Sequence, residues 1–339
     1  MPTIYASIIR QRMTAIVLIA VVCALLVVGD VMVGSTVIAF GDVIDSLLGA
    51  GNNTDGFIVW EIRLPMTLTC VFVGAALSLA GSLIQTVTAN PLASPYTLGL
   101  TAGASFGASL AITLGITLFG QLWLGTSLVA CLFALGVAGL ILILARSMGL
   151  SANALILLGI VMNFFFQALQ QYLLYCASPE VGQIIAGWTF GNLQRASWLS
   201  VWVSLVAWIV SLVISLGFVW DLTALSLGEE RARCLGILTE RLRLIVFVLA
   251  SVLVAASVSF IGTVAFIGLL APHCARLLIG DDQRFLLPAS AMTGAGLMLL
   301  ASIVSKYLSD GATLPVGIVT SLVGVPFLLI LLLKQREAR

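Results

Sequence analysis

Charged side chains are scarce in this sequence. It has 15 Lys and Arg and 14 Asp and Glu among 339 residues, so 9% of the chain is charged, whereas soluble domains carry about 25%. Apolar residues make up 61%, and the mean hydropathy is +1.19. The chain lacks the polar residues that a water-soluble globule needs at its surface, so we expect its solvent to be mostly lipid. The net charge of +1 gives no reason to expect a nucleic-acid partner.

Residues that build catalytic or metal centres are equally few. The six cysteines are dispersed without a CxxC pair, so neither a disulfide framework nor a zinc site is expected. The single histidine, His273, cannot supply the three or four ligands of a metal centre. The two lysines, Lys306 and Lys334, do not stand in a phosphate-binding loop of the form GxxxxGKS or GxxxxGKT. We therefore expect no enzyme activity, metal or cofactor in this chain, and energy from ATP would have to come from another subunit.

Long apolar runs fill most of the chain. A membrane-spanning helix needs about 20 largely apolar residues, and the sequence contains ten candidates. Glycine, alanine and serine are frequent within them, as in helices that pack closely in lipid. The pattern predicts an all-α polytopic membrane protein with a single domain over 1–339. The candidate spans are 13–34, 65–88, 95–116, 122–145, 153–176, 198–219, 243–262, 264–279, 286–306 and 315–333.

The basic residues are distributed unequally between the two sides that ten alternating spans define. One side, which holds both termini, receives Arg10, Arg12, Arg146, Arg231, Arg233, Arg241, Arg243, Arg276, Arg284, Lys334, Arg336 and Arg339. The other side receives Arg63, Arg195 and Lys306. Because cytoplasmic loops carry an excess of Lys and Arg, this asymmetry predicts a multi-pass membrane protein with both termini cytoplasmic.

Ionisable residues are nearly absent from the middles of the spans. Asp30 ends the first span and Lys306 ends the ninth. Ion-coupled carriers usually bury ionisable groups near mid-membrane. An ion-coupled secondary carrier is therefore the less favoured class, and transport by the isolated chain under an ion gradient would distinguish it.

Uncharged polar residues form a stripe in the fifth span. Asn163, Gln167, Gln170 and Gln171 recur at three to four residues and so share one helical face. An amide in lipid is costly without partners. The stripe predicts either a hydrated pathway lined by this helix, which we favour because there are four amides, or amide bonding between helices.

The longest cytoplasmic connection, about 221–242, gathers charge of both signs. Its sequence SLGEERARCLGILTERLR (226–243) predicts a short helix before Gly236, followed by a second charged segment. A basic amphipathic helix would suit anionic lipid, whereas mixed signs favour a protein partner. In a second cytoplasmic turn, Ser151 or Asn153 could cap the fifth span.

Four blocks of sequence resemble, in order, the iron-siderophore and cobalamin permease family of ATP-binding-cassette (ABC) importers. They are EIRLPMTLTCVFVGAALSLAGSLIQTVTANPLASPYTLGLTAGA, LSLGEERARCLGI, FIGTVAFIGLLAPHCARLLIGDDQRFLLP and LPVGIVTSLVGVPFLLILLLK. The resemblance runs from about residue 57 to 334 and implies a type II importer fold in the cytoplasmic (inner) membrane of a bacterium. It also implies a second permease subunit, two cytoplasmic ATPases that bind ATP and magnesium, and an external substrate-binding protein.

The resemblance further implies roles for individual residues. The coupling element that seats in the ATPase would comprise Leu227, Gly228, Glu229, Glu230, Arg231, Arg233, Leu235 and Gly236. Arg63 and Lys306 are similar in position to basic residues that dock the binding protein. Ser151 and Asn153 match the region of the cytoplasmic gate, and the stripe from Asn163 to Gln171 lies on a helix that lines the pathway.

Several positions depart from the family pattern. Met66 replaces a usual arginine and Thr313 a usual glutamate, and the ninth span has Ser302 and Lys306 where it commonly carries an Asp and an Arg. These losses fit one half of a permease heterodimer, which we favour over a homodimer. The outward loop Gly187–Trp198 resembles that of siderophore permeases, so a ferric siderophore is the expected cargo, with haem or cobalamin as alternatives.

Overall fold

Helices account for almost the whole described chain in the computed structural model, which describes residues 2–34, 36–49, 53–308 and 314–337. In chain order the elements are α1 (Pro2–Met32), α2 (Phe40–Leu47), α3 (Asn53–Phe57), the π-helix η1 (Ile58–Arg63), α4 (Leu64–Thr88), α5 (Leu100–Thr113), α6 (Leu122–Ser147), α7 (Ala152–Cys176), α8 (Pro179–Thr189), the 3-10 helix η2 (Leu193–Arg195), α9 (Trp198–Gly217), α10 (Val219–Ser226), α11 (Glu229–Cys234), α12 (Thr239–Ile261), α13 (Ile267–Ile279), α14 (Gln283–Tyr307) and α15 (Val316–Glu337).

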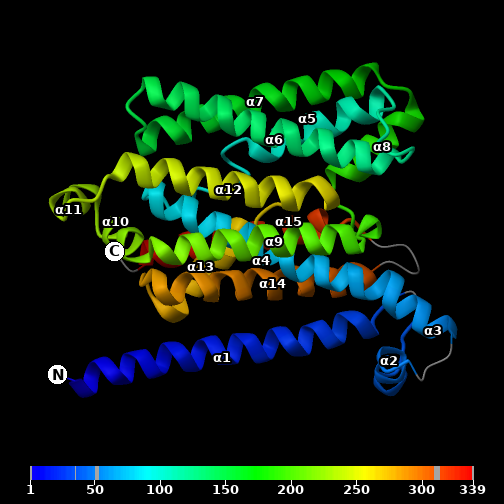
Figure 1. Ribbon diagram of the computed structural model, residues 1–339, viewed down its shortest axis with the longest axis horizontal. Coiled ribbons are helices and arrows are strands. Elements are labelled where there is room, and N and C mark those ends of the chain that lie inside the picture. The colour runs from blue at the N-terminus through cyan, green and yellow to red at the C-terminus, as the bar shows by residue number, and fades with distance from the viewer. Residues whose placement is uncertain (1, 35, 50–52, 309–313, 338–339) are drawn as a thin grey trace.

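The long helices run side by side in one bundle (Figure 1). Helices α5–α8 form one margin and α1 forms the opposite margin, with α4, α9 and α12–α15 between them. The start of α1 lies at the same end of the bundle as α10 and α11, and α2 and α3 lie at the other end. We call these the α11 end and the α2 end.

The prediction of an all-α polytopic fold is confirmed. Among the described residues, seven helices are long and apolar enough to cross a membrane, and α5, α13 and α15 contain shorter apolar stretches. Helix α5 begins at Leu100, later than the predicted 95, because the preceding turn holds Pro95 and because Gly99 has a φ of 74°.

Helix α8 was not anticipated as an element. Ser178 accepts a hydrogen bond from the Val181 amide and Pro179 occupies the first helical turn, the arrangement that starts many helices. The Ser-Pro pair was therefore the sequence signal for α8. The predicted outward loop 187–198 begins inside this helix.

Helix α4 is the centre of the bundle and packs against α14 through small residues. A Cβ on Gly74 would lie 2.5 Å from the Gly294 carbonyl oxygen, and a Cβ on Gly294 would lie 2.3 Å from that of Gly74. One turn further along α4, the Ser78 hydroxyl donates to the Ser290 carbonyl at 2.6 Å. The two backbones approach closely because neither helix presents bulk here, as is typical of helix packing in membranes.

Candidate functional site

A cavity of about 290 Å³ lies between α5, α7, α8 and the segment after α12. We call it the amide pocket, because all four amide side chains of the predicted stripe line it. Its polar lining residues are Tyr96, Thr101, Ser105, Asn163, Gln167, Gln170, Gln171, Thr189 and Thr263. None of its lining residues carries a charge.

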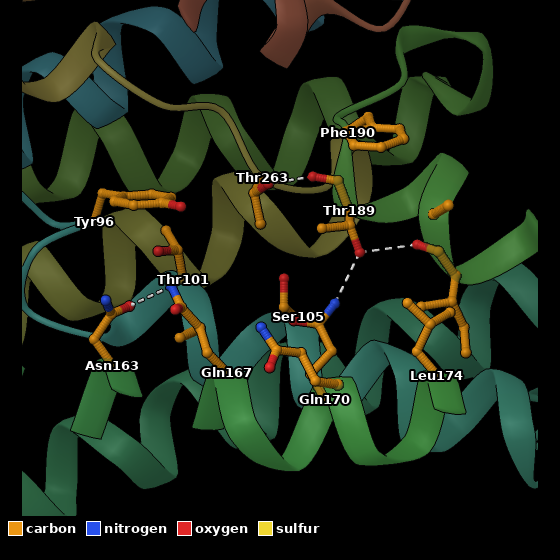
Figure 2. Close-up of a pocket in the computed structure, with 14 residues that line it drawn as sticks. Tyr96, Thr101, Ser105, Asn163, Gln167, Gln170, Leu174, Thr189, Phe190 and Thr263 are labelled. Carbon is orange, nitrogen blue, oxygen red and sulfur yellow. Dashed lines mark hydrogen bonds between the residues drawn. The ribbon is translucent and has the colours of Figure 1, made fainter. Parts of the chain in front are cut away.

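Hydrogen bonds link the elements around the amide pocket (Figure 2). Gln170 on α7 donates to the Thr189 hydroxyl on α8 at 2.8 Å. The Thr263 hydroxyl donates to the Thr189 carbonyl, so the segment after α12 also bonds to Thr189. Gln167 donates to the Asn163 amide oxygen at 3.4 Å. The amides thus take part both in lining a cavity and in bonding between helices, which the sequence analysis had treated as alternatives.

A buried hydroxyl without a partner also faces this cavity. Thr101 on α5 is 2% exposed, lines the pocket, and its Oγ1 makes no hydrogen bond. A buried polar atom usually has a partner, so Thr101 has an unused hydrogen-bonding group beside this cavity. Thr101, Ser105, Thr189 and Thr263 could not be predicted as lining residues, since isolated hydroxyls in small-residue helices carry no periodic signal.

Helix packing at the Asn163 end of the pocket depends on two glycines. Gly99 has a φ of 74°, and a Cβ there would lie 2.8 Å from the Asn163 backbone nitrogen. On the facing helix, a Cβ on Gly159 would lie 2.7 Å from Leu98 Cα. These contacts place the start of α5 directly against α7 at the level of Asn163.

Beyond α8, toward the α2 end, three segments are joined by backbone hydrogen bonds. The Asn192 amide donates to the Ile261 carbonyl at 2.7 Å, and the Val316 amide donates to the Gly191 carbonyl at 2.9 Å. Gly191 has a φ of 75°, and a Cβ there would lie 2.5 Å from the Thr263 carbonyl oxygen. The ends of α8 and α12 and the start of α15 therefore form one closed junction beside the amide pocket.

The predicted coupling element forms α11 and its flanks. As expected, the short helix ends before Gly236. Leu227 is 60% exposed and Leu235 is 71% exposed, and Glu230 and Arg231 are also exposed. Apolar and charged side chains thus stand together on an uncovered surface at the α11 end.

Two other residues of the predicted coupling element are engaged within the chain. Glu229 accepts from Arg233 at 2.7 Å and from the buried Arg243. The hydrogen bond from Arg243 is the main reason that the pKa of the Glu229 carboxyl is lowered below its usual range. Arg243 was not assigned a role from the sequence, since nothing in its own segment shows which distant groups it contacts.

The docking assignment of Arg63 and Lys306 is corrected by the structure. Arg63 is 4% exposed and donates to the carbonyls of Val31 and Met32 at the end of α1, at 2.8 and 2.7 Å. Four unpaired carbonyls end every helix, and the Arg63 guanidinium satisfies two of them. Its side chain is therefore not presented to a partner.

Lys306 is buried in an ion pair. Its Nζ lies 2.9 Å from Asp30 Oδ1 and donates to the Asp30 backbone carbonyl at 2.8 Å. Asp30 is fully buried and its other carboxylate oxygen accepts from Thr67 at 2.6 Å. The pair joins α1 to α14 and leaves Lys306 unavailable for docking. Thr313, one of the departures from the family pattern, lies outside the described residues.

Ser151 and Asn153, the two residues expected at the cytoplasmic gate, differ in their hydrogen bonding and exposure. Ser151 caps α7, because its hydroxyl accepts from the Ala154 amide at 3.1 Å. Asn153 is exposed. Of the two capping candidates, Ser151 is therefore the cap.

Comparison with known proteins places the chain in a family. Residues 16–334 match the model of the FecCD transport family. An ABC transporter permease protein of Methanocaldococcus jannaschii is 36% identical over 312 residues, which is 89% of each chain. The Fe(3+) dicitrate transport system permease protein FecD of Escherichia coli strain K12 is 35% identical over 285 residues, 83% of this chain and 86% of the relative.

A solved structure has the same fold. It is described as an inward-facing conformation of a metal-chelate type ABC transporter, and it superimposes with a TM-score of 0.85 at 30% identity over 94% of this chain and 98% of that chain. The helical bundle and its uncharged polar cavity are consistent with the family match. The chain therefore belongs to the FecCD transport family and is a membrane permease of the ABC importer type.

Proposed function

We propose that this chain carries a ferric siderophore, or a similar iron chelate, across the cytoplasmic membrane toward the cell interior. The observation that supports this cargo is the amide pocket, whose lining residues offer amides and hydroxyls and no charge. Iron chelates expose many oxygen atoms to such donors. Neutral hydrogen bonds contribute about 0.5–1.5 kcal/mol each, so a cargo held by them can also leave.

The α11 end is proposed to face the cytoplasm. Twelve of the 15 Lys and Arg belong to the side of the termini when the ten spans alternate, and cytoplasmic loops are enriched in these residues. The α2 end would then face outward, toward an external substrate-binding protein. Arg195 is the outward basic residue that is exposed, and it lines a second cavity of about 420 Å³ with Trp123.

The surface around α11 is proposed to bind a cytoplasmic ATPase, one of two in an assembly with a second permease chain. Exposed Leu227 and Leu235 beside exposed Glu230 and Arg231 offer both apolar area and charge. Interfaces of this kind combine an apolar centre with a polar rim.

Reversing the exposed charge should weaken ATPase binding. We expect Arg231→Glu to lower the amount of ATPase that co-purifies with the permease, because like charges then face each other across the interface. The effect should grow at low salt, where screening is least. Arg146→Glu, an exposed change at the end of α6, serves as the control, and equal co-purification by the two variants would exclude this docking surface.

The proposed cargo is tested by purifying the whole assembly and identifying the bound metal chelate by mass spectrometry, followed by uptake of that chelate into vesicles. Uptake that needs ATP, the ATPases and the binding protein is expected. Haem or cobalamin in the purified assembly would replace the siderophore as cargo. Uptake by this chain alone under an ion gradient would instead indicate a secondary carrier.

Changing an amide of the pocket should slow transport. Gln167→Leu removes a polar side chain of similar size from the lining, and the loss of one neutral hydrogen bond predicts a decrease of about two- to tenfold in uptake. Gln183→Leu on α8 is the matched control, since Gln183 is exposed and does not line the cavity. If both variants transport equally, the amide pocket is not on the cargo's route.

A further inference from the structure

Arg243 connects three parts of the chain that are far apart in sequence. Its side chain is 3% exposed in the second turn of α12. Its Nε donates to the Val87 carbonyl near the end of α4 at 3.1 Å. Its two terminal nitrogens bind the two Glu229 carboxylate oxygens at 3.1 and 2.5 Å. One guanidinium on α12 therefore contacts both α4 and α11.

The contact with Val87 has a physical reason. Val87 lies in the last turn of α4, where backbone carbonyls lack partners within the helix and a cation is favourable. Helix α4 ends at Thr88, and Ala89 reverses the chain with a φ of 48°. The next residues form the turn that supplies Tyr96 to the amide pocket. A displacement of the end of α4 would therefore move the turn that carries Tyr96, which lines the cavity.

Helix α11 is held to the bundle at few points. Gly228 has a φ of 122° and Gly236 a φ of 83°, so the helix lies between two glycines in conformations that other residues rarely adopt. Ala232 is its buried side chain. Two side-chain contacts among the described residues tie α11 to α12: the ion pair of Glu229 with the buried Arg243 and a longer hydrogen bond from Arg233 to the Thr239 hydroxyl at 3.4 Å.

We propose that Glu229 and Arg243 are positioning residues that transmit movement of α11 to the inner end of α4 and, through the turn at 89–99, to the amide pocket. This inference rests on the proposed function, in which α11 is the surface that the ATPase grips. The planar guanidinium of Arg243 can bind the Glu229 carboxylate with two nitrogens while its third nitrogen donates to the Val87 carbonyl. Lysine would preserve the charge but could not make this set of bonds.

The link can first be tested on the purified chain without any partner. Glu229→Gln removes the ionic contact, so the backbone amides of Ala89, Asn90 and Ala93, which form hydrogen bonds in the turn, should exchange with solvent about tenfold faster or more. Glu240→Gln, an exposed change in the first turn of α12, is the control and should leave exchange there unchanged. Equal exchange in the two variants would overturn the proposal.

The second test uses the assembled transporter. Arg243→Lys should retain the ATPases at the parental level and continue to hydrolyse ATP, while uptake of the chelate falls about tenfold. Arg241→Lys is the matched control, since Arg241 is exposed two residues earlier, and its uptake should equal that of the parent. If the two residues act as a unit, the double variant Glu229→Gln with Arg243→Lys loses no more uptake than the more impaired single variant.

Two results of the second test would overturn the transmission role. In one, Arg243→Lys takes up chelate as well as Arg241→Lys does. In the other, Arg243→Lys loses the ATPases, which would make Arg243 part of the docking surface itself. Failure of the parental chain to bind ATPases or take up chelate would instead contradict the proposed function, and the exchange measurement on the isolated chain distinguishes that case because it needs neither partner nor cargo.

Discussion

Gly81→Ala is expected to prevent the bundle from forming its native packing. A Cβ at this position would lie 1.7 Å from the Gly268 carbonyl oxygen, closer than any non-bonded contact, and the obstacle is backbone that cannot rotate away. Helices α4 and α13 would have to separate along their central contact. Overpacking a core usually costs about 1–3 kcal/mol, and we expect the upper end of that range or more. The measurement is the unfolding temperature of the detergent-solubilised chain and its recovery as a single species.

A glycine elsewhere in the bundle provides the control for this prediction. Gly136 lies on the exposed side of α6, with open space where a Cβ would stand. Alanine stabilises a helix interior by roughly 0.5–1 kcal/mol relative to glycine, so Gly136→Ala should be neutral or slightly stabilising. Equal stability of the two alanine variants would mean that the α4–α13 contact is not as close as the structure indicates.

Among substitutions that remove a single charge, the loss of the Lys306 ammonium should destabilise the folded chain most. Lys306→Met leaves the fully buried Asp30 carboxylate without its cation, and breaking a buried pair in this way costs about 3–5 kcal/mol. The expected result is a lower unfolding temperature and release of α1 from α14, measurable as increased protease cleavage in the segment after α1. Arg146→Met, which removes an exposed cation, should have little effect.

The double variant Asp30→Asn with Lys306→Met separates this explanation from a general loss of packing. Neutralising both partners removes the uncompensated charge, and such replacements are often nearly neutral. We therefore expect the double variant to recover most of the stability lost in Lys306→Met. A double variant as unstable as the single one would show that the lysine stem, rather than its charge, holds the helices together.

Several features could be read from local sequence alone. Runs of apolar residues predicted the spans, and the charged stretch before Gly236 predicted the short helix α11. The amide spacing in the fifth span correctly placed Asn163, Gln167, Gln170 and Gln171 on one face, since all four line one cavity. These predictions succeed because helical periodicity and transfer into lipid are properties of neighbouring residues.

The roles of the outward basic residues could not be read in the same way. The docking role of Arg63 and Lys306 was expected from their positions in the resemblance to the permease family, which says nothing about their burial. Whether such a cation is buried depends on what lies beside it, and Asp30 is 276 residues away from Lys306 in the chain. No pattern within either segment shows that the two helices pack together.

By itself, then, the sequence determined that this chain is an all-α protein suited to lipid, where its long apolar runs lie, and which stretch collects its charge. The tertiary structure alone decided which polar groups share a cavity, which ion pairs close inside the bundle, and that one arginine joins α11 to α4. The reason is physical: hydropathy sums over adjacent residues, whereas the free energy of a buried polar group depends on partners that only the packed helices bring within hydrogen-bond distance.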